Sequence, residues 1–458
     1  MSKINLEVSF GRVARMTASV FGAAAFVGAL LFLGLMAGGI LSTRAGNNKV
    51  TLLFRNAAIL STLYYPQFPG GPLGYHWNRP FTSLSKDGPV TRYDPDRSYA
   101  GANLLVTAEG TKAALVSMTG DVLHSWSRSF EEVWPDTSHI PGFRPDLNFY
   151  WRRVHLYPNG DILAIYESPD LTPYGLGLAK LDKNSNVVWK VAGGFHHDLT
   201  VGPDGRIYVL FQEISDKPYM DRAAFKTPYL SEGVAVLDRN GKLVRKVHLL
   251  DAVAGSDRFP LLNTLFLQSL EGDFIHMNTV QYIDAALANR FPFAKPGQLL
   301  VSMREMNTIA ILDIRTEQIV WSMAGLFHHQ HEPQFLPNGN VLVFDNLGHR
   351  GAGEGATRIL EFDPLTQALV WKYTGTVEDP LESPFYGSQQ RFPNGNTMIV
   401  EAMNGRVLEV TPDKDVVWQY RVTARRTHLG VTYIPVITDM VRYAPGTLEF
   451  LAAARPPG

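Results

Sequence analysis

The stretch HLYPNGDILAIYE (155–167), followed by GLGLAKLDKNSNVVWKV (175–191), decides the fold because variants of it recur along the chain. Its first part predicts two hydrophobic strands joined at Pro-Asn-Gly, a turn in which Pro sets φ and Gly accepts a positive φ. Its second part, a hydrophobic strand, a polar turn and a strand ending in Val-Trp, predicts a hairpin. Each unit therefore predicts four short antiparallel strands.

Three further units make the repeat clear. They read HHDLTVGPDGRIYVLFQE (196–213) with GVAVLDRNGKLVRKV (233–247), HHQHEPQFLPNGNVLVFDN (328–346) with RILEFDPLTQALVWKY (358–373), and QQRFPNGNTMIVEA (389–402) with RVLEVTPDKDVVWQY (406–420). A spacing of roughly 50 to 75 residues is typical of propeller blades with loop insertions. The predicted outer strands are marked by Trp126, Trp189, Trp321, Trp371 and Trp418, with Val244 to Val247 in the unit that lacks a tryptophan. We expect these tryptophans to pack between blades.

Counting these marks predicts an all-β fold, a six-bladed β-propeller over residues 101–458. The first unit, Leu104 to Trp126, is one strand short, and the segment from Val431 to Leu451 can supply the missing strand. A blade completed in this way by a strand from the other end of the chain closes the ring and removes exposed sheet edges.

The N-terminus predicts a transmembrane helix ahead of the propeller. Met16 to Leu41 is almost wholly apolar, and some 20 such residues span a bilayer, whereas the apolar core of a cleaved signal peptide has about 7 to 15. We therefore expect residues 1–45 to form an uncleaved membrane anchor and residues 46–100 a connecting lead; a long cleavable signal is the alternative. Basic residues flank both ends of the segment, so the expectation that the propeller faces the extracytoplasmic (periplasmic) side is only a preference.

Composition excludes several functions. The formal net charge is −1 and no long basic run is present, which argues against a nucleic-acid partner. The chain has no cysteine, so disulfides, thiolate metal sites and cysteine nucleophiles are excluded. Nothing in the sequence calls for a cofactor or a metal.

Three histidines occupy equivalent positions in different units. His197 and His331 each lie six residues before the Pro of the turn, at the predicted start of an innermost strand, and His276 starts the corresponding strand of the unit between them. The starts of innermost strands meet at one mouth of a propeller channel, so we expect these side chains to converge. Capping of strand ends or hydrogen bonding across the channel is the structural alternative. Strand alternation predicts that the neighbouring His196 points elsewhere.

Two more residues indicate which kind of chemical group the predicted site binds. Asn278 follows His276 by two and should point to the same side of the strand, and Arg304 lies in the predicted second strand of the same unit. An arginine and an amide beside imidazoles donate hydrogen bonds to a tetrahedral oxyanion. Alternatively, Arg304 forms a structural ion pair with Glu305 or with an aspartate of a neighbouring blade.

The HHD, H-x-N, S-x-R and QHE…FDN segments, between about Trp151 and Trp418, resemble the bacterial PAPS-independent arylsulfotransferases. The resemblance implies a six-bladed propeller enzyme, without cofactor, that transfers a sulfuryl group from a small aryl sulfate to a phenolic acceptor. It implies that His331 is the nucleophile and forms a sulfohistidine, and that the sulfuryl oxygens are bound by His197, His276, Asn278 and Arg304. The anchor and the absence of cysteine depart from the periplasmic members of that family.

Two other functions remain open. A metal oxygenase with one histidine from each of several blades would use His197, His276 and His331 but would leave Arg304 unexplained. A non-catalytic scaffold subunit of a membrane complex would explain the anchor and would require nothing of the histidines.

Overall fold

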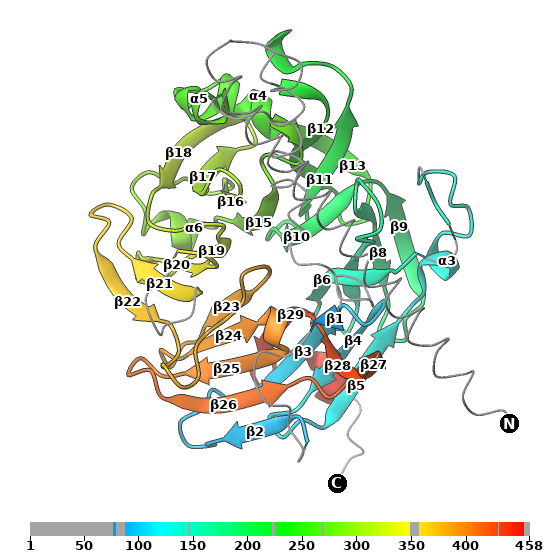
Figure 1. The fold of residues 1–458 in the computed structure, drawn as a ribbon, viewed down its shortest axis with the longest axis vertical. Coiled ribbons are helices and arrows are strands. Elements are labelled where there is room, and N and C mark those ends of the chain that lie inside the picture. Colours follow the sequence, from blue (N-terminus) through cyan, green and yellow to red (C-terminus); the bar gives the residue numbers. More distant parts are fainter. Residues whose placement is uncertain are drawn as a thin grey trace, which may run out of the picture. The chain divides into compact units, whose positions relative to one another are not determined.

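Six antiparallel sheets are arranged around one axis in the computed structural model (Figure 1), which confirms the predicted propeller. The structure describes residues 77–78, 88–140, 142–144, 147–221, 225–266, 270–348, 357–428 and 430–452. The predicted transmembrane segment, Met16 to Leu41, lies outside these residues. Within the described part of the chain, no helix is long and apolar enough to cross a membrane.

Each blade has four main strands, which follow one another from the axis outward. Blade 1 consists of β29 (Ile437–Tyr443), β3 (Ala102–Thr107), β4 (Lys112–Val116) and β5 (Val122–Ser127). Blade 2 consists of β6 (Tyr150–Leu156), β7 (Ile162–Glu167), β8 (Gly175–Leu181) and β9 (Val187–Ala192). Blade 3 consists of β10 (Phe195–Val201), β11 (Ile207–Ser215), β12 (Phe225–Leu237) and β13 (Leu243–His248).

The other three blades follow the same order. Blade 4 consists of β15 (Met277–Tyr282), β16 (Leu299–Met303), β17 (Thr308–Asp313) and β18 (Gln318–Ala324). Blade 5 consists of β19 (His331–Phe335), β20 (Val341–Asp345), β21 (Arg358–Phe362) and β22 (Leu369–Tyr373). Blade 6 consists of β23 (Ser388–Arg391), β24 (Thr397–Glu401), β25 (Arg406–Val410) and β26 (Val416–Arg421), with β2 (Val90–Tyr93) added outside as a fifth strand.

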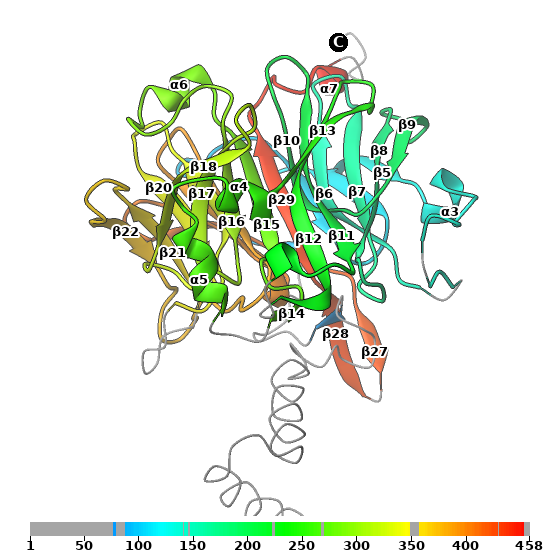
Figure 2. The same cartoon turned by 90° about the horizontal axis from the view of Figure 1, so that it is seen from above.

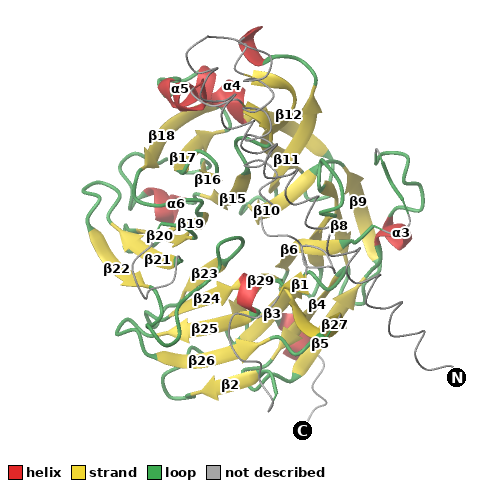
Figure 3. Ribbon diagram, in the orientation of Figure 1, coloured by secondary structure: helices red, strands yellow, loops and turns green. Residues whose placement is uncertain are grey.

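Short elements decorate the blades (Figures 2 and 3). β14 (Leu270–Gly272) pairs in parallel with β12, and β1 (Trp77–Asn78), β28 (Val431–Pro435) and β27 (Arg426–His428) form a small separate sheet. The connecting helices are α3 (Phe130–Val133), α4 (Leu249–Ala254), α5 (Pro260–Phe266), α6 (Ala285–Ala288) and α7 (Glu449–Ala452), with the 3-10 turns η1 (Tyr219–Asp221) and η2 (Ala402–Asn404).

The ring closes through its last innermost strand, as predicted. β29 pairs antiparallel with β3 from Ile437 opposite Thr107 to Tyr443 opposite Ala102. Blade 1 therefore combines a strand from the end of the chain with three strands from its beginning, which leaves no gap between the first and last blades.

Hydrophobic packing lies between blades rather than in one central core. Six clusters of buried side chains each join two adjacent blades, for example Leu163 of blade 2 with Val209 of blade 3. Burying one such side chain contributes about 1.5–3 kcal/mol. The outer-strand tryptophans pack in these clusters as predicted, and the indole of Trp418 donates a 2.9 Å hydrogen bond to the Met118 carbonyl of the next blade.

The innermost strands share an irregularity that positions the site. Register shifts interrupt five of them near their first residues, including the shift between Phe195 and Leu199 in β10 and that between His331 and Gln334 in β19. Such bulges re-aim side chains. They are found where the sequence places its histidines.

Candidate functional site

The structure brings the predicted site residues together at the starts of three innermost strands. His331 is the first residue of β19, His197 lies in β10, and His276 immediately precedes β15, which contains Asn278. Arg304 directly follows β16, and its backbone N–H donates a 3.1 Å hydrogen bond to the His276 carbonyl. The rings of His197 and His276 lie edge to face with their centroids 4.8 Å apart.

A hydrogen bond determines the tautomer of His331. Its Nδ1 lies 2.7 Å from Oδ1 of Asn346, whose amide nitrogen donates to the carbonyls of Ser383 (2.6 Å) and Tyr386 (2.7 Å). Because Oδ1 can only accept, Nδ1 of His331 carries the proton. Its Nε2 then has the free lone pair, and this atom has no hydrogen-bond partner among the described residues.

The surroundings of His331 favour the uncharged ring. Its side chain is buried, and burial together with the positive charge of Arg304 holds the pKa of His331 well below its usual range. A neutral imidazole with a lone pair on Nε2 is a nucleophile at physiological pH.

The backbone at the other two histidines is strained. His197 and His276 both have φ near +52°, in the left-handed region that non-glycine residues seldom adopt. A residue of this kind costs on the order of 1–3 kcal/mol and is enriched at functional sites. The chain approaching His197 also requires glycine, because a Cβ at Gly194 would lie 2.1 Å from the Gln212 carbonyl oxygen.

Arg304 and Asn278 both use part of their hydrogen-bonding capacity within the protein. Nε of Arg304 donates to Oε1 of Glu305 at 2.9 Å, and Nη2 contacts the same oxygen, so the ion pair considered from the sequence is present. Nη1 of Arg304 has no partner among the described residues. The Asn278 amide donates to the Gln330 carbonyl at 2.7 Å, directly before His331, which leaves it one further N–H.

The prediction that His196 points away from the site was wrong. Its Nδ1 lies 2.8 Å from Nδ1 of His197, and its Nε2 lies 3.7 Å from Oε1 of Glu232. Alternation fails because the positive φ of His197 and the register shift in β10 interrupt the regular strand. Burial lowers the pKa of His196 to about 3.

Sequence reasoning also missed Tyr174, in the loop between β7 and β8. Its ring centroid lies 5.4 Å from that of His197 and 6.2 Å from that of His276. The phenol oxygen is buried and has no hydrogen-bond partner among the described residues, and burial, with the charge of Asp273, raises its pKa well above the usual range. No local pattern marks this loop residue, whereas Asn346 could have been found because it follows the residue paired with His331 by two.

A buried charge cluster lies one residue further along the same innermost strands. Arg153 contacts Asp198 at 2.7 Å, Glu332 at 2.8 Å and Asp439 at 2.9 Å, so a single guanidinium of blade 2 meets carboxylates of blades 3, 5 and 1. Asp198 and Glu332 directly follow His197 and His331. Burial raises the pKa of Glu332 to about 8, against the opposing effect of Arg153.

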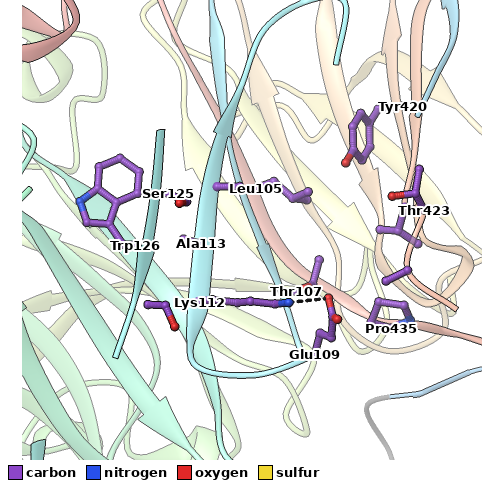
Figure 4. A pocket seen from close by; sticks show the side chains of 14 residues that line it. Leu105, Thr107, Glu109, Lys112, Ala113, Ser125, Trp126, Tyr420, Thr423 and Pro435 are labelled. Carbon is purple, nitrogen blue, oxygen red and sulfur yellow. Dashed lines mark ion pairs between the residues drawn. The ribbon is translucent and has the colours of Figure 1, made fainter. Parts of the chain in front are cut away.

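A separate pocket of about 280 Å³ lies between blades 1 and 6 (Figure 4). Leu105, Trp126, Tyr420 and Pro435 are among the residues that line it, and Lys112 pairs with Glu109 at 3.0 Å beside it. It contains none of the predicted site residues. In the described ranges, no group of three or more His, Cys, Asp or Glu residues is arranged to hold a metal ion.

Comparisons with known proteins gave one family and several distant structures. A family model described as Arylsulfotransferase (ASST) matches residues 153–423. No curated protein matches the chain. The similar solved structures include a protein of unknown function from Bacteroides caccae, at 13% identity and a TM-score of 0.45, with 75% of this chain and 99% of that one covered. They also include a streptogramin B lyase (11% identity, TM-score 0.40, 80% and 97% covered) and the WD40 β-propeller domain of Doa1 (12%, 0.38, 80% and 95%).

Proposed function

The chain belongs to the arylsulfotransferase family, and from this we propose that it transfers a sulfuryl group from an aryl sulfate to a phenolic acceptor through a sulfohistidine at Nε2 of His331. The observation that carries the proposal is the neutral His331 ring with its proton held on Nδ1 by Asn346. In the first half-reaction, Nε2 attacks sulfur, the bond from sulfur to the aryl oxygen breaks, and its electron pair leaves with the phenolate. In the second, the acceptor oxygen attacks the same sulfur and regenerates the imidazole.

The groups around His331 supply electrostatic stabilisation of the transferring sulfuryl group. Nη1 of Arg304 and the remaining amide N–H of Asn278 are donors, and His197 and His276 add imidazole nitrogens that have no other partner among the described residues. Glu305 fixes the Arg304 guanidinium through two of its nitrogens, so this donor is held in place before substrate binds.

The proposal is tested by incubating the purified full-length chain with 4-nitrophenyl sulfate and a phenol acceptor. Nitrophenolate release that depends on the acceptor supports sulfuryl transfer, and ping-pong kinetics or a burst of release without acceptor supports the covalent intermediate. No release together with about one equivalent of bound iron would favour a metal oxygenase instead. No release and no metal would favour a non-catalytic scaffold.

Replacing Asn346 by Ala is expected to lower kcat on the order of 10²-fold with little change in KM, because Nδ1 of His331 loses the acceptor that fixes its tautomer and stabilises the charged sulfohistidine. Steady-state kinetics with 4-nitrophenyl sulfate measure this. Asn340→Ala, in the turn at the far end of the same β19–β20 hairpin, is the matched control and should retain wild-type kcat. Equal losses in both variants would contradict the role of Asn346.

We also propose that residues 1–45 anchor the protein in a membrane as a single-pass helix, with the propeller on the extracytoplasmic side. The proposal rests on the apolar segment from Met16 to Leu41. After fractionation, the full-length chain should remain in the membrane pellet through alkaline carbonate washing, and protease added to spheroplasts should digest the propeller. Release by carbonate would contradict the anchor, and protection from protease would reverse the orientation.

A further inference from the structure

A continuous row of buried groups lies behind His197. Its Nδ1 contacts Nδ1 of His196 at 2.8 Å, and Nε2 of His196 faces Oε1 of Glu232 at 3.7 Å. Neither of these last two atoms has a hydrogen-bond partner among the described residues. The side chains of His196 and Glu232 are fully buried.

The contact between the two Nδ1 atoms couples the tautomers of the two rings, because only one proton fits between them. When His196 donates, His197 carries its own proton on Nε2 and can act as an acid. When His197 donates, its Nε2 has a lone pair and can act as a base. In that second state the proton of His196 lies on Nε2 and faces Glu232.

We propose that Glu232, His196 and His197 form a proton relay that protonates the departing phenolate and later deprotonates the phenolic acceptor; this inference rests on the sulfuryl transfer proposed above. As the bond from sulfur to the aryl oxygen breaks, Nε2 of His197 gives its proton to the phenolate oxygen. The Nδ1 proton of His196 moves to Nδ1 of His197, and the carboxyl proton of Glu232 moves to Nε2 of His196. The negative charge of the leaving group thus ends on the Glu232 carboxylate, and the second half-reaction reverses every step.

Burial favours the charge states that this relay needs. It raises the pKa of Glu232 well above its usual range, with a further contribution from Asp273, which favours the protonated carboxyl group from which the relay starts. Burial also lowers the pKa of His196 to about 3 and that of His197 well below its usual range, so both rings are neutral. The relay never requires an imidazolium. Its carboxylate is stabilised by the Met277 backbone N–H, which donates to Oε2 at 2.9 Å.

The geometry requires a small movement. Nε2 of His196 and Oε1 of Glu232 must approach by roughly 0.8 Å to reach hydrogen-bonding distance. Oε2 of Glu232 is held by Met277, so a rotation of the carboxyl group about that contact is enough to bring Oε1 forward. Oε1 makes no hydrogen bond within the described residues, and the backbone N–H groups of Met277 and His276 both face this carboxyl group.

Glu232→Gln tests the relay, because glutamine keeps the shape and the acceptor for Met277 but has no proton to release. The test measures the first half-reaction alone, as the burst of phenol release when enzyme is mixed with donor and no acceptor is present, for aryl sulfates whose phenols range from strong to weak acids. With 4-nitrophenyl sulfate, a good leaving group that needs little protonation, the variant should stay within about 3-fold of wild type. With phenyl sulfate, whose phenolate needs a proton, the rate should fall on the order of 10²–10³-fold.

Glu167→Gln is the matched control. Glu167 is also buried and accepts the backbone N–H of His197 at 2.7 Å, but no contact joins it to the His196 ring. Its replacement disturbs the position of His197 but not the proton transfer, so it should lower the reaction rates with all aryl sulfates by the same factor. A uniform loss in Glu232→Gln, or no loss with any aryl sulfate, would overturn the relay while leaving sulfuryl transfer intact. A wild type that is inactive with every aryl sulfate would instead overturn the proposed function.

The tautomers provide a readout that needs no turnover and no variant. In protein labelled with ¹⁵N-histidine, the resting state should show a proton on Nδ1 of His196 and on Nε2 of His197. An imidazolium at either residue, or Nδ1 lacking a proton on both, would overturn the relay.

Discussion

Replacement of His331 by Ala is expected to abolish nitrophenolate release, with a loss of at least about 10⁴-fold in kcat. The reason is that Nε2 of His331 is the proposed nucleophile, so that no covalent intermediate forms without it. The measurement has two parts: the rate with 4-nitrophenyl sulfate and a phenol acceptor, and the intact mass of the protein after donor is added alone. Wild type should gain the mass of one sulfuryl group, and the variant should gain none.

His124→Ala is the control for this experiment. This histidine lies in the outermost strand of blade 1, where it contacts the Lys183 carbonyl at 2.7 Å, and its loss should leave both rate and mass gain unchanged. A His331→Ala protein that still gains a sulfuryl group would show that another residue is the nucleophile. Similar unfolding temperatures for the two variants would show that the loss is chemical rather than structural.

Arg153→Met is expected to cost about 3–5 kcal/mol of unfolding free energy, because it leaves three buried carboxylates without their shared cation. The loss should be larger above pH 8 than at pH 6. The pKa of Glu332 is raised to about 8, so below that pH its carboxyl group is protonated and loses little when Arg153 is removed. Above pH 8 the ionised Glu332 adds its repulsion to that of Asp198 and Asp439. Urea denaturation at both pH values measures the difference.

Arg391→Met provides the comparison, because within the described ranges Arg391 pairs with one carboxylate only, that of Glu361. Its replacement should be less destabilising than that of Arg153. Equal losses of unfolding free energy in the two variants would contradict the view that Arg153 neutralises the charges of carboxylates from three blades at once.

Much of the fold could be predicted from local patterns. The Pro-Asn-Gly turns and the tryptophans of the outer strands depend on residues near one another in sequence, and the missing strand of the first unit was found by counting such units; the structure confirms all three. The convergence of His197, His276 and His331 was predictable because equivalent positions in different blades meet near the axis.

Contacts between side chains of different strands, by contrast, could not be predicted. Glu232 of β12 lies behind His196 of β10, two strands away in the same blade, and Arg153 of blade 2 meets Asp439 on the closing strand of blade 1. The direction of His196 was missed for a different reason: strand alternation was applied to a position where the register shifts. The anchor stays a prediction, since it lies outside the described residues.

The late position of β29 in the chain has a consequence for biosynthesis. While a ribosome is still producing residues up to 436, the nascent chain already contains every histidine of the site, but blade 1 has no innermost strand and Arg153 has only two of its carboxylates. The final strand supplies both the closing hydrogen bonds and Asp439. The ring can therefore close only after residues 437–443 have been made, and a product truncated before them lacks both the innermost strand of blade 1 and the Asp439 partner of Arg153.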